Sequence, residues 1–528
     1  MGPEIWPFKV RRKSPKADAT SRLFQDAMME LKPDAQKHSV DVAIVGYGPV
    51  GATLANILGS RGVKISVFDK EPSIYHQPRA GHIDGEAMRV FQSVGLAKEV
   101  EERAAINAGM RFEDSKGRLL LDWPRPQTIG VDGWYPSYRI HQPFLEETLR
   151  NGVERFANVS ARLRCDVFAI EQGTENVSLR YEDMTNGSIH HIQARYVVGC
   201  DGARSVVRRF MESTTDDLRS HERWVVVDVI LKKPRSDLPA VTVQICDEIR
   251  PTTMIKMVGD RRRWEFMLTP DDDARMIVKD KEVQKLLSRW VDPEDVEIER
   301  AVVYTFHSVV VRGWRKNRMI LAGDACHQTP PFMGQGMCAG IRDVANLGWK
   351  LCLALKNESA ASLLDTYETE RSPHVRKYID TAVSLGALIQ AGPRSNGRET
   401  ITELAQMPQM MRSLLVALGP GLNTDHNLGG TLVPQIIFEG GEKLDDVVGS
   451  SFALLMSSDL TTQFQVHQSK RLSDAGIALI SGPEVDALLE RLGIGFIVMR
   501  PDRYIYEVGD RCEKLDKTLD EMSERGLI

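Results

Sequence analysis

The sequence lacks the features that would place it in a membrane, on a nucleic acid or outside the cell. Its 528 residues contain no uninterrupted apolar run of about 18 residues, the length that a membrane-spanning helix needs. A formal net charge of -5 provides no overall positive field to attract nucleic acid or an anionic membrane. The cysteines number 7, an odd count, and none of them forms a CxxC pair, which argues against a disulfide scaffold and a zinc site. We therefore expect a cytoplasmic protein with no metal site and no nucleic-acid or membrane partner.

The first 37 residues differ in composition and hydrophobic patterning from the rest of the chain. They carry charges of both signs, hold no apolar stretch of signal-peptide length, and are too rich in acids for a mitochondrial presequence. We predict a flexible N-terminal extension over residues 1–37, with a short helix near residues 21–31. The sequence leaves the role of this extension open.

Beyond the extension, the composition and hydrophobic patterning are those of a large globular enzyme. Hydrophobic residues make up 42% and charged residues 27% of the chain, and the length predicts about three domains. Residues 40–45 and 63–68 read as buried strands on either side of a helix at 52–61, and residues 334–356 and 360–391 read as helices. An antiparallel sheet is indicated by further strand-like segments at 177–181, 194–199, 224–231, 241–245 and 264–268.

A glycine motif follows the first of these strands. Gly46, Gly48 and Gly51 form GxGxxG between a strand and a helix, and Asp69 ends the next strand 18 residues after Gly51. The first glycine permits a tight turn, the second lets the backbone approach a pyrophosphate, and the third lets helix and strand pack closely. The start of the helix offers unpaired N–H groups to phosphates, and Asp69 can accept hydrogen bonds from a ribose. The pattern predicts a dinucleotide site, without deciding between FAD and NAD(P).

Two later segments identify the dinucleotide. Asp201-Gly202 follows a strand, and Gly323-Asp324 precedes a glycine-rich stretch that contains Gly334 and Gly336. Together with the first motif, they resemble the class A FAD-dependent aromatic monooxygenases over residues 38–380. Within that family the chain is most similar to the 3-(3-hydroxyphenyl)propionate and 3-hydroxycinnamate hydroxylases, with phenol and polyketide hydroxylases as neighbours. Shorter matches that carry this closer likeness lie at residues 79–84, 142–143, 246–251, 334–337 and 500–502.

The resemblance implies FAD as the bound cofactor and NADH or NADPH as a co-substrate. The residues that it assigns to cofactor binding, with their neighbours in the same motifs, are Gly46, Gly48, Pro49, Val50, Gly51, Asp69, Lys70, Arg79, Gln142, Val167, Asp201, Gly202, Gly323, Asp324, Gly334, Gly336, Met337 and Cys338. Asp324 would bond a ribityl hydroxyl, and the N–H groups of Met337 and Cys338 would face flavin N1 and O2. The positive end of a glycine-rich helix is suited to the negative charge that a reduced flavin carries there.

The implied reaction is an NAD(P)H- and O2-consuming hydroxylation of a phenolic or aromatic substrate through a flavin C4a-hydroperoxide. The phenol needs a base or proton relay, for which His82, Asp84 and Tyr304 are candidates, and Pro331 would lie beside the flavin. Arg250 or Arg263 could pair with a substrate carboxylate, with a plain surface arginine as the equal alternative. Two other functions stay open: an FAD-dependent epoxidase or dehydrogenase of the same superfamily acting on a non-phenolic metabolite, and a flavoprotein without turnover.

Other reactive residues near these motifs have simpler interpretations. His327 is expected to be structural, and Cys326, Cys338 and Cys352 are expected to be packed thiols because their spacing fits no zinc pattern. Arg342-Asp343 is most simply helix surface and core. The substrate itself, the choice between NADH and NADPH, and the phenol-deprotonating base are not identified by the sequence.

The predicted fold is mixed α/β. It combines a Rossmann-like FAD-binding domain with an inserted antiparallel-sheet substrate domain. Residues 444–455 and 499–505 resemble the thioredoxin-like domain appended to phenol hydroxylases, which implies a C-terminal domain of that kind; it lacks CxxC and so has no dithiol chemistry. A homodimer is left open. The predicted segments are the FAD-binding domain at 38–217, the substrate sheet at 218–310, the completing part of the FAD-binding domain with long helices at 311–400, a linker at 401–429 and the thioredoxin-like domain at 430–528.

Overall fold

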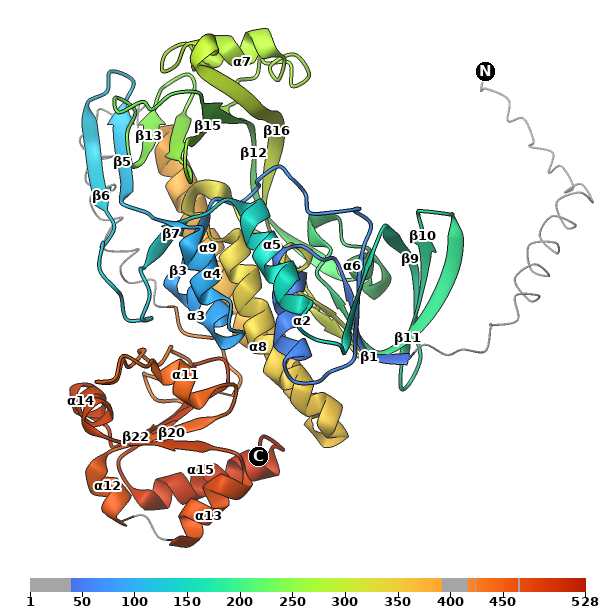
Figure 1. Ribbon diagram of the computed structural model, residues 1–528, viewed down its shortest axis with the longest axis vertical. Coiled ribbons are helices and arrows are strands. Elements are labelled where there is room, and N and C mark those ends of the chain that lie inside the picture. The colour runs from blue at the N-terminus through green and yellow to red at the C-terminus, as the bar shows by residue number, and fades with distance from the viewer. Residues whose placement is uncertain (1–38, 392–415, 423, 464–465) are drawn as a thin grey trace, which may run out of the picture. The chain divides into compact units, whose positions relative to one another are not determined.

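The computed structural model describes residues 39–391, 416–422, 424–463 and 466–528 (Figure 1). The chain divides into two compact units, Met1–Ser39 and Val40–Ile528, and the second contains all the architecture described below. The expected extension at 1–37, its helix at 21–31 and the first half of the expected linker at 401–429 lie outside the described residues. Within the part that is described, no helix combines the length and the apolar character needed to cross a membrane.

The first sheet is the core of the FAD-binding domain. Its strands run in the order β17-β18-β11-β1-β2-β8, with β10 attached to β11 and β9 to β10. β1 is parallel to β2, and β11 is parallel to β18, which comes from much later in the chain. The domain is therefore discontinuous, as predicted. The strands are β1 Ser39–Val45, β2 Ile65–Asp69, β8 Val159–Leu163, β9 Cys165–Gln172, β10 Val177–Asp183, β11 Ser188–Gly199, β17 Arg315–Lys316 and β18 Met319–Leu321.

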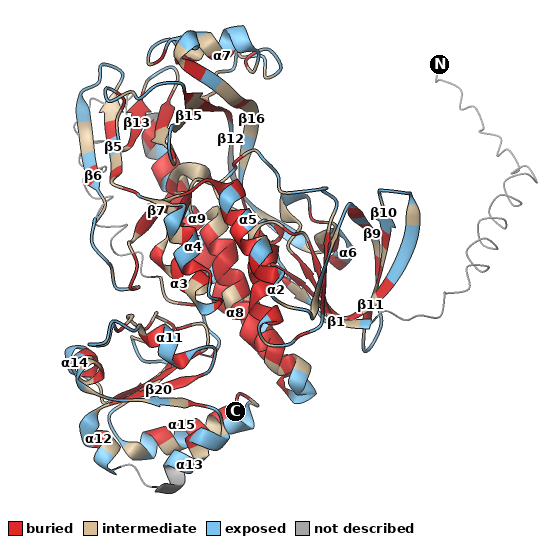
Figure 2. Ribbon diagram, viewed as in Figure 1, coloured by how far each residue is buried: buried red, intermediate tan, exposed pale blue. Residues whose placement is uncertain are grey.

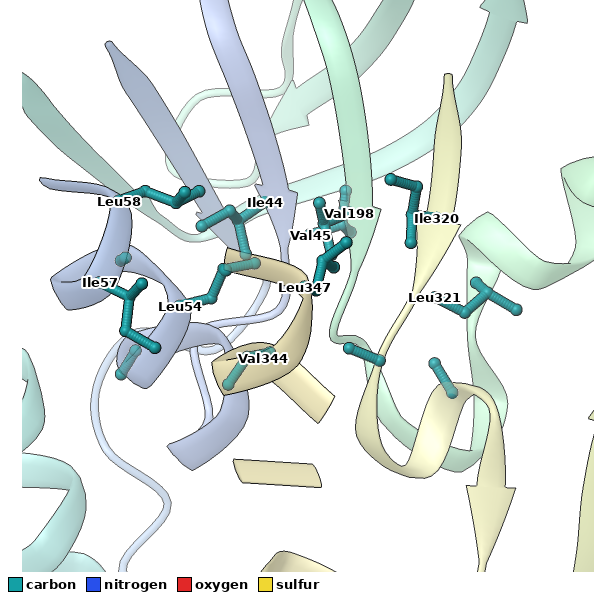
Figure 3. Close-up of a cluster of buried hydrophobic side chains, with 14 of the residues drawn as sticks. Ile44, Val45, Leu54, Ile57, Leu58, Val198, Ile320, Leu321, Val344 and Leu347 are labelled. Carbon is teal, nitrogen blue, oxygen red and sulfur yellow. The ribbon is translucent and has the colours of Figure 1, made fainter. Parts of the chain in front are cut away.

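The core of this domain lies between the sheet and helices α2 (Pro49–Gly59) and α8 (Gly336–Lys356). Figure 3 shows Ile44 and Val198 of the sheet beside Leu54 of α2 and Leu347 of α8. Burying one such aliphatic side chain stabilises the fold by roughly 1.5–3 kcal/mol, and these side chains therefore hold α2 and α8 against the sheet. Figure 2 shows that α8 is buried over most of its length. α2 begins earlier than the predicted helix at 52–61, because proline is well accepted in a first helical turn.

The second sheet forms the substrate domain, in the order β19-β16-β12-β15-β14-β13-β5-β6. Helix α7 (Asp280–Leu287) covers one face, where alternate residues such as Val227, Trp264 and Phe266 form an apolar cluster. The sheet is antiparallel except between β13 and β5. The strands are β5 Gly109–Asp114, β6 Leu119–Pro124, β12 Thr214–Leu231, β13 Thr242–Cys246, β14 Thr252–Lys256, β15 Arg261–Met267, β16 Val296–Arg312 and β19 His327–Gln328.

The borders of the substrate domain differ from the predicted contiguous segment 218–310. β5 and β6 come from before residue 218, and β19 comes from after residue 310. All five segments expected as strands overlap strands, but 177–181 and 194–199 belong to the first sheet. Local periodicity marks a strand without identifying its partner, which is why 177–181 and 194–199 were assigned to the wrong sheet, and β5 and β6 were not predicted as strands.

A small third sheet and several helices connect the two domains. Strand β7 (Ser137–Arg139) lies between β3 (His82–Asp84) and β4 (Ala105–Ile106). Long helix α9 (Asp365–Ala391) follows a 3-10 segment, so the helix predicted at 360–391 begins later than expected. The remaining helical elements here are α3 Gly85–Ser93, α4 Ala97–Glu102, α5 Gln142–Val153, η1 Gly202–Arg204, α6 Val206–Met211, η2 Pro293–Asp295, η3 Gly323–Ala325, η4 Pro331–Met333 and η5 Glu358–Leu364.

The C-terminal domain has the thioredoxin-like arrangement. Its sheet order is β21-β20-β22-β23, with β20 parallel to β21 and antiparallel to β22, and from β20 onward the element order is βααβαββα. The elements are α11 Leu444–Val448, β20 Ala453–Met456, α12 Ser458–Gln463, α13 Val466–Asp474, β21 Ala478–Ile480, α14 Pro483–Leu492, β22 Phe496–Met499, β23 Ile505–Gly509 and α15 Cys512–Glu524.

Buried ion pairs join this domain to the rest of the unit. Arg500 pairs with Glu370 of α9 at 2.8 Å, and Lys350 of α8 pairs with the same carboxylate at 2.7 Å, all with fully buried side chains. Arg89 of α3 pairs with Asp445 of α11 at 2.8 Å. Because a buried charge without a partner is costly, each of these pairs makes the domain contact specific.

Candidate functional site

The three glycines of the first motif differ in whether the fold itself requires a glycine at that position. Gly46 has φ +101°, and a Cβ there would lie 2.4 Å from the carbonyl oxygen of Cys200. A Cβ on Gly51 would lie 2.0 Å from the carbonyl oxygen of Gly46, so strand and helix can approach only without it. Gly48 has ordinary backbone angles, and a Cβ there would meet nothing within 4 Å. The fold does not require a glycine at Gly48, and the open space above it is available to a ligand.

The start of α2 is uncapped beside this open space. Gly48 is the N-cap and contributes no side-chain bond, and Pro49 occupies the first turn. The N–H groups of Val50 and Gly51 therefore have no capping side chain, and they stand at the positive end of the helix. This arrangement suits a phosphate group.

Asp69 fixes the turn that carries the motif. One carboxylate oxygen accepts from the Tyr47 N–H at 2.9 Å, and the other accepts from the Glu71 N–H at 2.9 Å. Each oxygen retains a lone pair for a ribose hydroxyl. Arg150 of α5 donates to the Tyr47 carbonyl at 3.1 Å and lies 3.7 Å from Asp69. Sequence reasoning missed Arg150, because no local pattern connects a helix residue to a turn about a hundred positions earlier.

Only one of the two carboxylate oxygens of Asp201 accepts hydrogen bonds from the described residues. Its Oδ2 accepts from the N–H groups of Val206 and Val207 at 2.6 and 3.2 Å, at the start of α6. Its Oδ1 is buried and has no partner among the described residues, and burial raises the pKa of this carboxyl group. An unpaired buried oxygen is costly unless a donor reaches it, so this atom fits a ligand hydroxyl. The neighbouring Gly202 has φ +74° and open space at its Cβ position.

A buried network holds the turn that presents Asp324. Asp343 accepts from the Gly323 N–H at 3.0 Å, from His327 Nε2 at 2.6 Å and from Arg371 Nε at 3.0 Å. The Asp324 side chain is exposed, yet protein lies around it closely enough that burial raises its pKa. A carboxylate in that position is placed to accept hydrogen bonds from a ligand rather than from the protein.

Cys326, His327 and Asp343 bring potential metal-ligand atoms within 4.8 Å of one another. Both oxygens of Asp343 are already used, and the positive charge of Arg371 beside them disfavours a cation. Burial raises the pKa of the Cys326 thiol well above its ordinary value, so it stays protonated. We interpret the three residues as a protein network that positions the Gly323 turn.

The start of α8 is the second uncapped helix end. Gln335 is its N-cap and makes no side-chain cap bond, which leaves the N–H groups of Met337 and Cys338 without a capping side chain. Gly334 has φ +64°, and a Cβ there would come within 3.0 Å of His82. The turn before α8 therefore depends on glycine, and it presents a second positive helix end.

The first and third motifs meet in space although they lie far apart in the sequence. A Cβ on Gly340 of α8 would lie 2.6 Å from Val50 of α2 and 3.0 Å from the Cα of Gly323. The start of α2, the Asp324 turn and the first turns of α8 are thus in direct contact. The structure brings together the residues of the first and third motifs, as a single extended ligand requires.

Of the candidate bases, His82 and Asp84 already have protein partners. His82 Nδ1 lies 3.2 Å from the Gly334 carbonyl, and its Nε2 lies 2.8 Å from Ser137 Oγ. Burial lowers the pKa of His82 to about 4, so the ring is neutral near pH 7. Asp84 accepts from the Ala87 N–H as the N-cap of α3 and pairs with Arg342 at 2.6 Å. Burial alone would raise the pKa of Asp84, but Arg342 and His82 lower it below its usual value.

The interpretation of Arg342-Asp343 as helix surface and core was wrong in its surface part, because both residues are buried. Arg342 is 4% exposed and Asp343 is fully buried. Arg342 binds Asp84 and Glu86, the first residues of the α3 region, while Asp343 binds the Gly323 turn. Helical periodicity placed them on α8, but it could not show that other elements cover that face.

Tyr304 and Pro331 lie on the side of the substrate sheet that faces the α8 turn. Tyr304 is opposite Trp224 in the sheet register, and the Trp224 ring is 5.8 Å from Phe332, the neighbour of Pro331 in η4. Tyr304 is half-buried, and its hydroxyl accepts from Arg300 at 3.0 Å. Since Arg300 occupies a lone pair, the proton of the tyrosine hydroxyl remains available to a ligand.

Arg250 and Arg263, the candidates for carboxylate binding, both have protein partners. Arg250 pairs with Asp272 at 2.8 Å. Arg263 pairs with Asp228 at 2.7 Å and donates to the Pro78 carbonyl at 2.6 Å. Arg263 is only 4% exposed, so the alternative of a surface arginine was wrong for it. Its role in the structure is to hold the segment that ends in Arg79.

The remaining predicted cofactor residues act in different ways. Gln142 is buried, and its Oε1 accepts from the Arg79 and Ala80 N–H groups at 3.1 and 2.6 Å, so it orders this segment. Arg79 itself is exposed and free to reach a phosphate. Lys70 is exposed at the end of β2, whereas the side chain of Val167 is packed in the core.

These observations fit FAD. Open space lies over Gly48, Asp201 Oδ1 lacks a protein donor among the described residues, and the Asp324 carboxylate is exposed. Two uncapped helix starts would serve the two electron-rich parts of the cofactor, its pyrophosphate and the N1/O2 edge of its flavin.

Comparison with known proteins agrees with this arrangement. Residues 39–382 match the family described as FAD binding domain. A probable NADH-specific resorcinol 4-hydroxylase from Rhodococcus jostii is 36% identical over 412 residues, which cover 76% of this chain and 76% of the relative. A 3-(3-hydroxy-phenyl)propionate/3-hydroxycinnamic acid hydroxylase from Mycolicibacterium gilvum is 33% identical over 527 residues, which cover 93% of this chain and 88% of the relative.

Solved structures share the fold at lower identity. The flavin-dependent monooxygenase PieE, in complex with FAD and substrate, superposes with a TM-score of 0.78 at 20% identity and covers 94% of this chain and 99% of its own. A ternary complex of aklavinone-11 hydroxylase with FAD and aklavinone gives a TM-score of 0.75 at 21% identity, covering 92% of this chain and 99% of its own. The similarity extends through all three domains of the fold.

Proposed function

This chain belongs to the family of FAD-dependent aromatic hydroxylases, and on that basis we propose that it adds one oxygen atom of O2 to a small phenolic ring with NADH as electron donor. Membership of the family makes it a flavoprotein monooxygenase. The proposal concerns the phenolic substrate and the use of NADH. The names of the two relatives, one a resorcinol hydroxylase called NADH-specific and one a hydroxyphenylpropionate hydroxylase, support both choices.

The observation that carries the proposal is the meeting of two uncapped helix starts and the exposed Asp324 beside the substrate sheet. The start of α2 and Asp69 would hold the pyrophosphate and the adenosine ribose of FAD, and Asp324 would hold its ribityl chain. The N–H groups at the start of α8 would face the flavin ring. When bound, FAD supplies the transfer of electrons from the nicotinamide to O2 and the activation of oxygen.

An apolar cluster adjoins the α8 turn and would exclude water from the reacting ring. Met333 and Phe332 of η4 pack with Phe112 and Trp123 of the substrate sheet and with Tyr378 of α9. Water exclusion strengthens the polar contacts inside the site and suppresses loss of reducing equivalents to solvent. The aromatic character of this cluster also suits the face of a phenolic ring.

We assign the contact with the phenol oxygen to Tyr304. Its hydroxyl accepts from Arg300, which in turn pairs with Asp228 at 2.8 Å, so the group is oriented and keeps one proton to donate or relay. His82 and Asp84 are positioning residues in this proposal, because their polar atoms hold Gly334 and Arg342. Tyr304→Phe should lower kcat and shift its pH profile while FAD content stays unchanged. A Tyr304→Phe enzyme with the wild-type pH profile would contradict the assignment.

The function itself is tested by substrate-dependent NADH oxidation. Phenolic substrates such as resorcinol and 3-(3-hydroxyphenyl)propionate should accelerate NADH oxidation by the FAD-loaded enzyme and yield a product heavier by one oxygen atom. Asp324→Ala should give a folded protein depleted of FAD, which separates cofactor loss from loss of chemistry. If no phenol in a broad panel accelerates NADH oxidation by fully loaded enzyme, the proposed reaction is wrong.

A further inference from the structure

Arg139 is an arginine without an acidic partner close to the α8 turn. It is the last residue of β7 and lies opposite His82 in the register of the small sheet. Side chains opposite each other on paired strands project from the same face, so Arg139 shares a face with the histidine that contacts Gly334. Its guanidinium donates to the Thr242 hydroxyl at the start of β13. Arg139 thus reaches from the flavin side of the site to the substrate sheet.

Arg125 is a second such arginine in the same place. It follows β6, where its N–H donates to the Ala108 carbonyl at 3.1 Å, and its guanidinium lies 4.9 Å from the centre of the Trp123 ring. Trp123 belongs to the apolar cluster beside η4. The carboxylate whose charge acts on Arg125 is that of Asp84, and Asp84 already pairs with Arg342.

The two guanidinium groups have no carboxylate in direct contact within the part of the chain that is described, although the charge of the buried Glu265 acts on Arg139. Among the described residues, no carboxylate lies within the 4.0 Å of an ion pair with either of them. Burial lowers the pKa of Arg139 to about 10, and repulsion from Arg125 and Arg263 adds to the decrease, while the charge of Glu265 only partly opposes it. Two like charges held together away from bulk water are unfavourable unless an anion joins them. Both side chains nonetheless keep some exposed surface, so an anion can reach them.

Most arginines near the substrate face of the sheet have an acidic partner, whereas Arg262 of β15 and Arg289 donate to backbone carbonyl groups instead. Arginines of the substrate sheet and its loops that have an acidic partner are Arg111 with Asp122, Arg118 with Asp114, Arg250 with Asp272, Arg261 with Glu299, Arg263 with Asp228 and Arg300 with Asp228. Arg125 and Arg139 also have no ion pair among the described residues, but unlike Arg262, which lies opposite Val229 on the α7 side of the sheet, they lie where the sheet meets the α8 turn.

We propose that Arg139 and Arg125 bind the carboxylate of the substrate, so that the physiological substrate is a phenol with an acidic side chain rather than a neutral dihydroxybenzene. This inference rests on the proposed function, whose site it shares. A guanidinium matches a carboxylate in planar, two-point geometry, and Trp123 beside Arg125 supplies apolar contact for the ring or side chain of the substrate. The phenol oxygen would then meet Tyr304, and the two polar ends of the substrate would fix which ring carbon is presented.

The same charges could instead serve a phosphate of the nicotinamide dinucleotide, and the experiment separates the two sources. Holoenzyme is titrated with 3-phenylpropionate, which lacks the ring hydroxyl, and with neutral 3-phenylpropionamide, while the flavin absorbance reports binding. NAD+ is titrated in parallel by calorimetry. The variants are Arg139→Gln, Arg125→Gln and Arg139→Lys, with Arg111→Gln on the exposed side of β5 as the matched control.

Each glutamine variant should weaken binding of the acid by about 10- to 100-fold, the effect of losing a charge-assisted hydrogen bond, and should leave the amide unchanged. Arg139→Lys should recover part of the loss, and Arg111→Gln should behave as wild type. Equal weakening of acid and amide, no weakening of either, or selective loss of NAD+ binding would each overturn the assignment.

Turnover distinguishes failure of this inference from failure of the proposed function. If resorcinol is hydroxylated as efficiently as 3-(3-hydroxyphenyl)propionate, the enzyme is a phenol hydroxylase and the carboxylate site is wrong. If no phenol is hydroxylated but the acid still binds through Arg139 and Arg125, the carboxylate site stands and the reaction is wrong. FAD content of every variant, read from its absorbance, excludes trivial loss of the cofactor.

Discussion

Gly48→Val should separate cofactor binding from folding. Gly48 has φ -71° and ψ -172°, which any residue adopts, and a Cβ there would meet no protein atom within 4 Å. Replacing glycine where the backbone is ordinary gains about 0.4–1 kcal/mol from the unfolded state, and valine as an N-cap loses a similar amount, roughly 0.5–1 kcal/mol. The free energy of unfolding of the apoprotein should therefore change by less than about 1 kcal/mol.

The effect on FAD should be much larger. The valine side chain would occupy the space over the start of α2 and keep a pyrophosphate from the N–H groups of Val50 and Gly51. Two lost hydrogen bonds to a charged group are worth about 3–6 kcal/mol, which corresponds to a dissociation constant raised at least about 100-fold. Binding is measured by the quenching of FAD fluorescence on titration with apoprotein, and stability by urea unfolding of the same apoprotein.

Two further variants make the result interpretable. Gly440→Val introduces the same side chain at another glycine with open space and no left-handed backbone, so it should change neither stability nor FAD binding. Gly51→Ala should reduce both, because its Cβ would lie 2.0 Å from the Gly46 carbonyl oxygen. Wild-type FAD affinity in Gly48→Val would refute the placement of the cofactor over α2.

Two other predictions concern stability. Glu370→Gln should destabilise the protein by about 3–5 kcal/mol, because it leaves the fully buried Arg500 without full charge compensation. Arg471→Gln, which removes an exposed ion pair, should cost less than about 1 kcal/mol. Equal urea midpoints for the two variants would contradict the role of the buried pair. The pKa of His82 is lowered to about 4, so the unfolded chain takes up its proton first as the pH falls. Its contribution, about 3 kcal/mol, is present above pH 6.5 and is lost between pH 6.5 and 4, and His82→Gln should flatten the stability profile over that range. An unchanged profile would mean that His82 is not buried in its neutral form.

The fold could be predicted from the sequence to the extent that its signals are local. The strand before Gly46 was predicted from its apolar run, whereas the discontinuity of the FAD-binding domain was predicted from the family resemblance of the segment around Gly323-Asp324. The thioredoxin-like domain was predicted only from its likeness to the domain that phenol hydroxylases carry, because the residue pattern beyond about residue 430 indicates no more than a compact α/β segment. Strands β5 and β6 were not predicted at all, and a strand pattern by itself would not have shown that they join the substrate sheet.

In the candidate site, too, residues with a local sequence signal were predictable and residues that act from distant parts of the chain were not. Glycines that the backbone demands, such as Gly46 and Gly51, carry a signature in their spacing. Residues that act across the chain do not: Arg150 supports Asp69, and Asp343 supports the Asp324 turn, from positions that sequence periodicity describes only as helix. The charge partners of Arg263 were likewise hidden, because Asp228 is its neighbour only through strand pairing.

The central claim, that this chain hydroxylates a phenolic ring with oxygen from O2, is tested most directly by the origin of the oxygen in the product. FAD-loaded enzyme is supplied with NADH, 3-(3-hydroxyphenyl)propionate and isotopically heavy O2, and the product is analysed by mass spectrometry. We expect one heavy oxygen atom per product molecule, with NADH consumed in equal amount. A product that has lost two hydrogens without gaining oxygen, or that has gained its oxygen from water, would contradict the account.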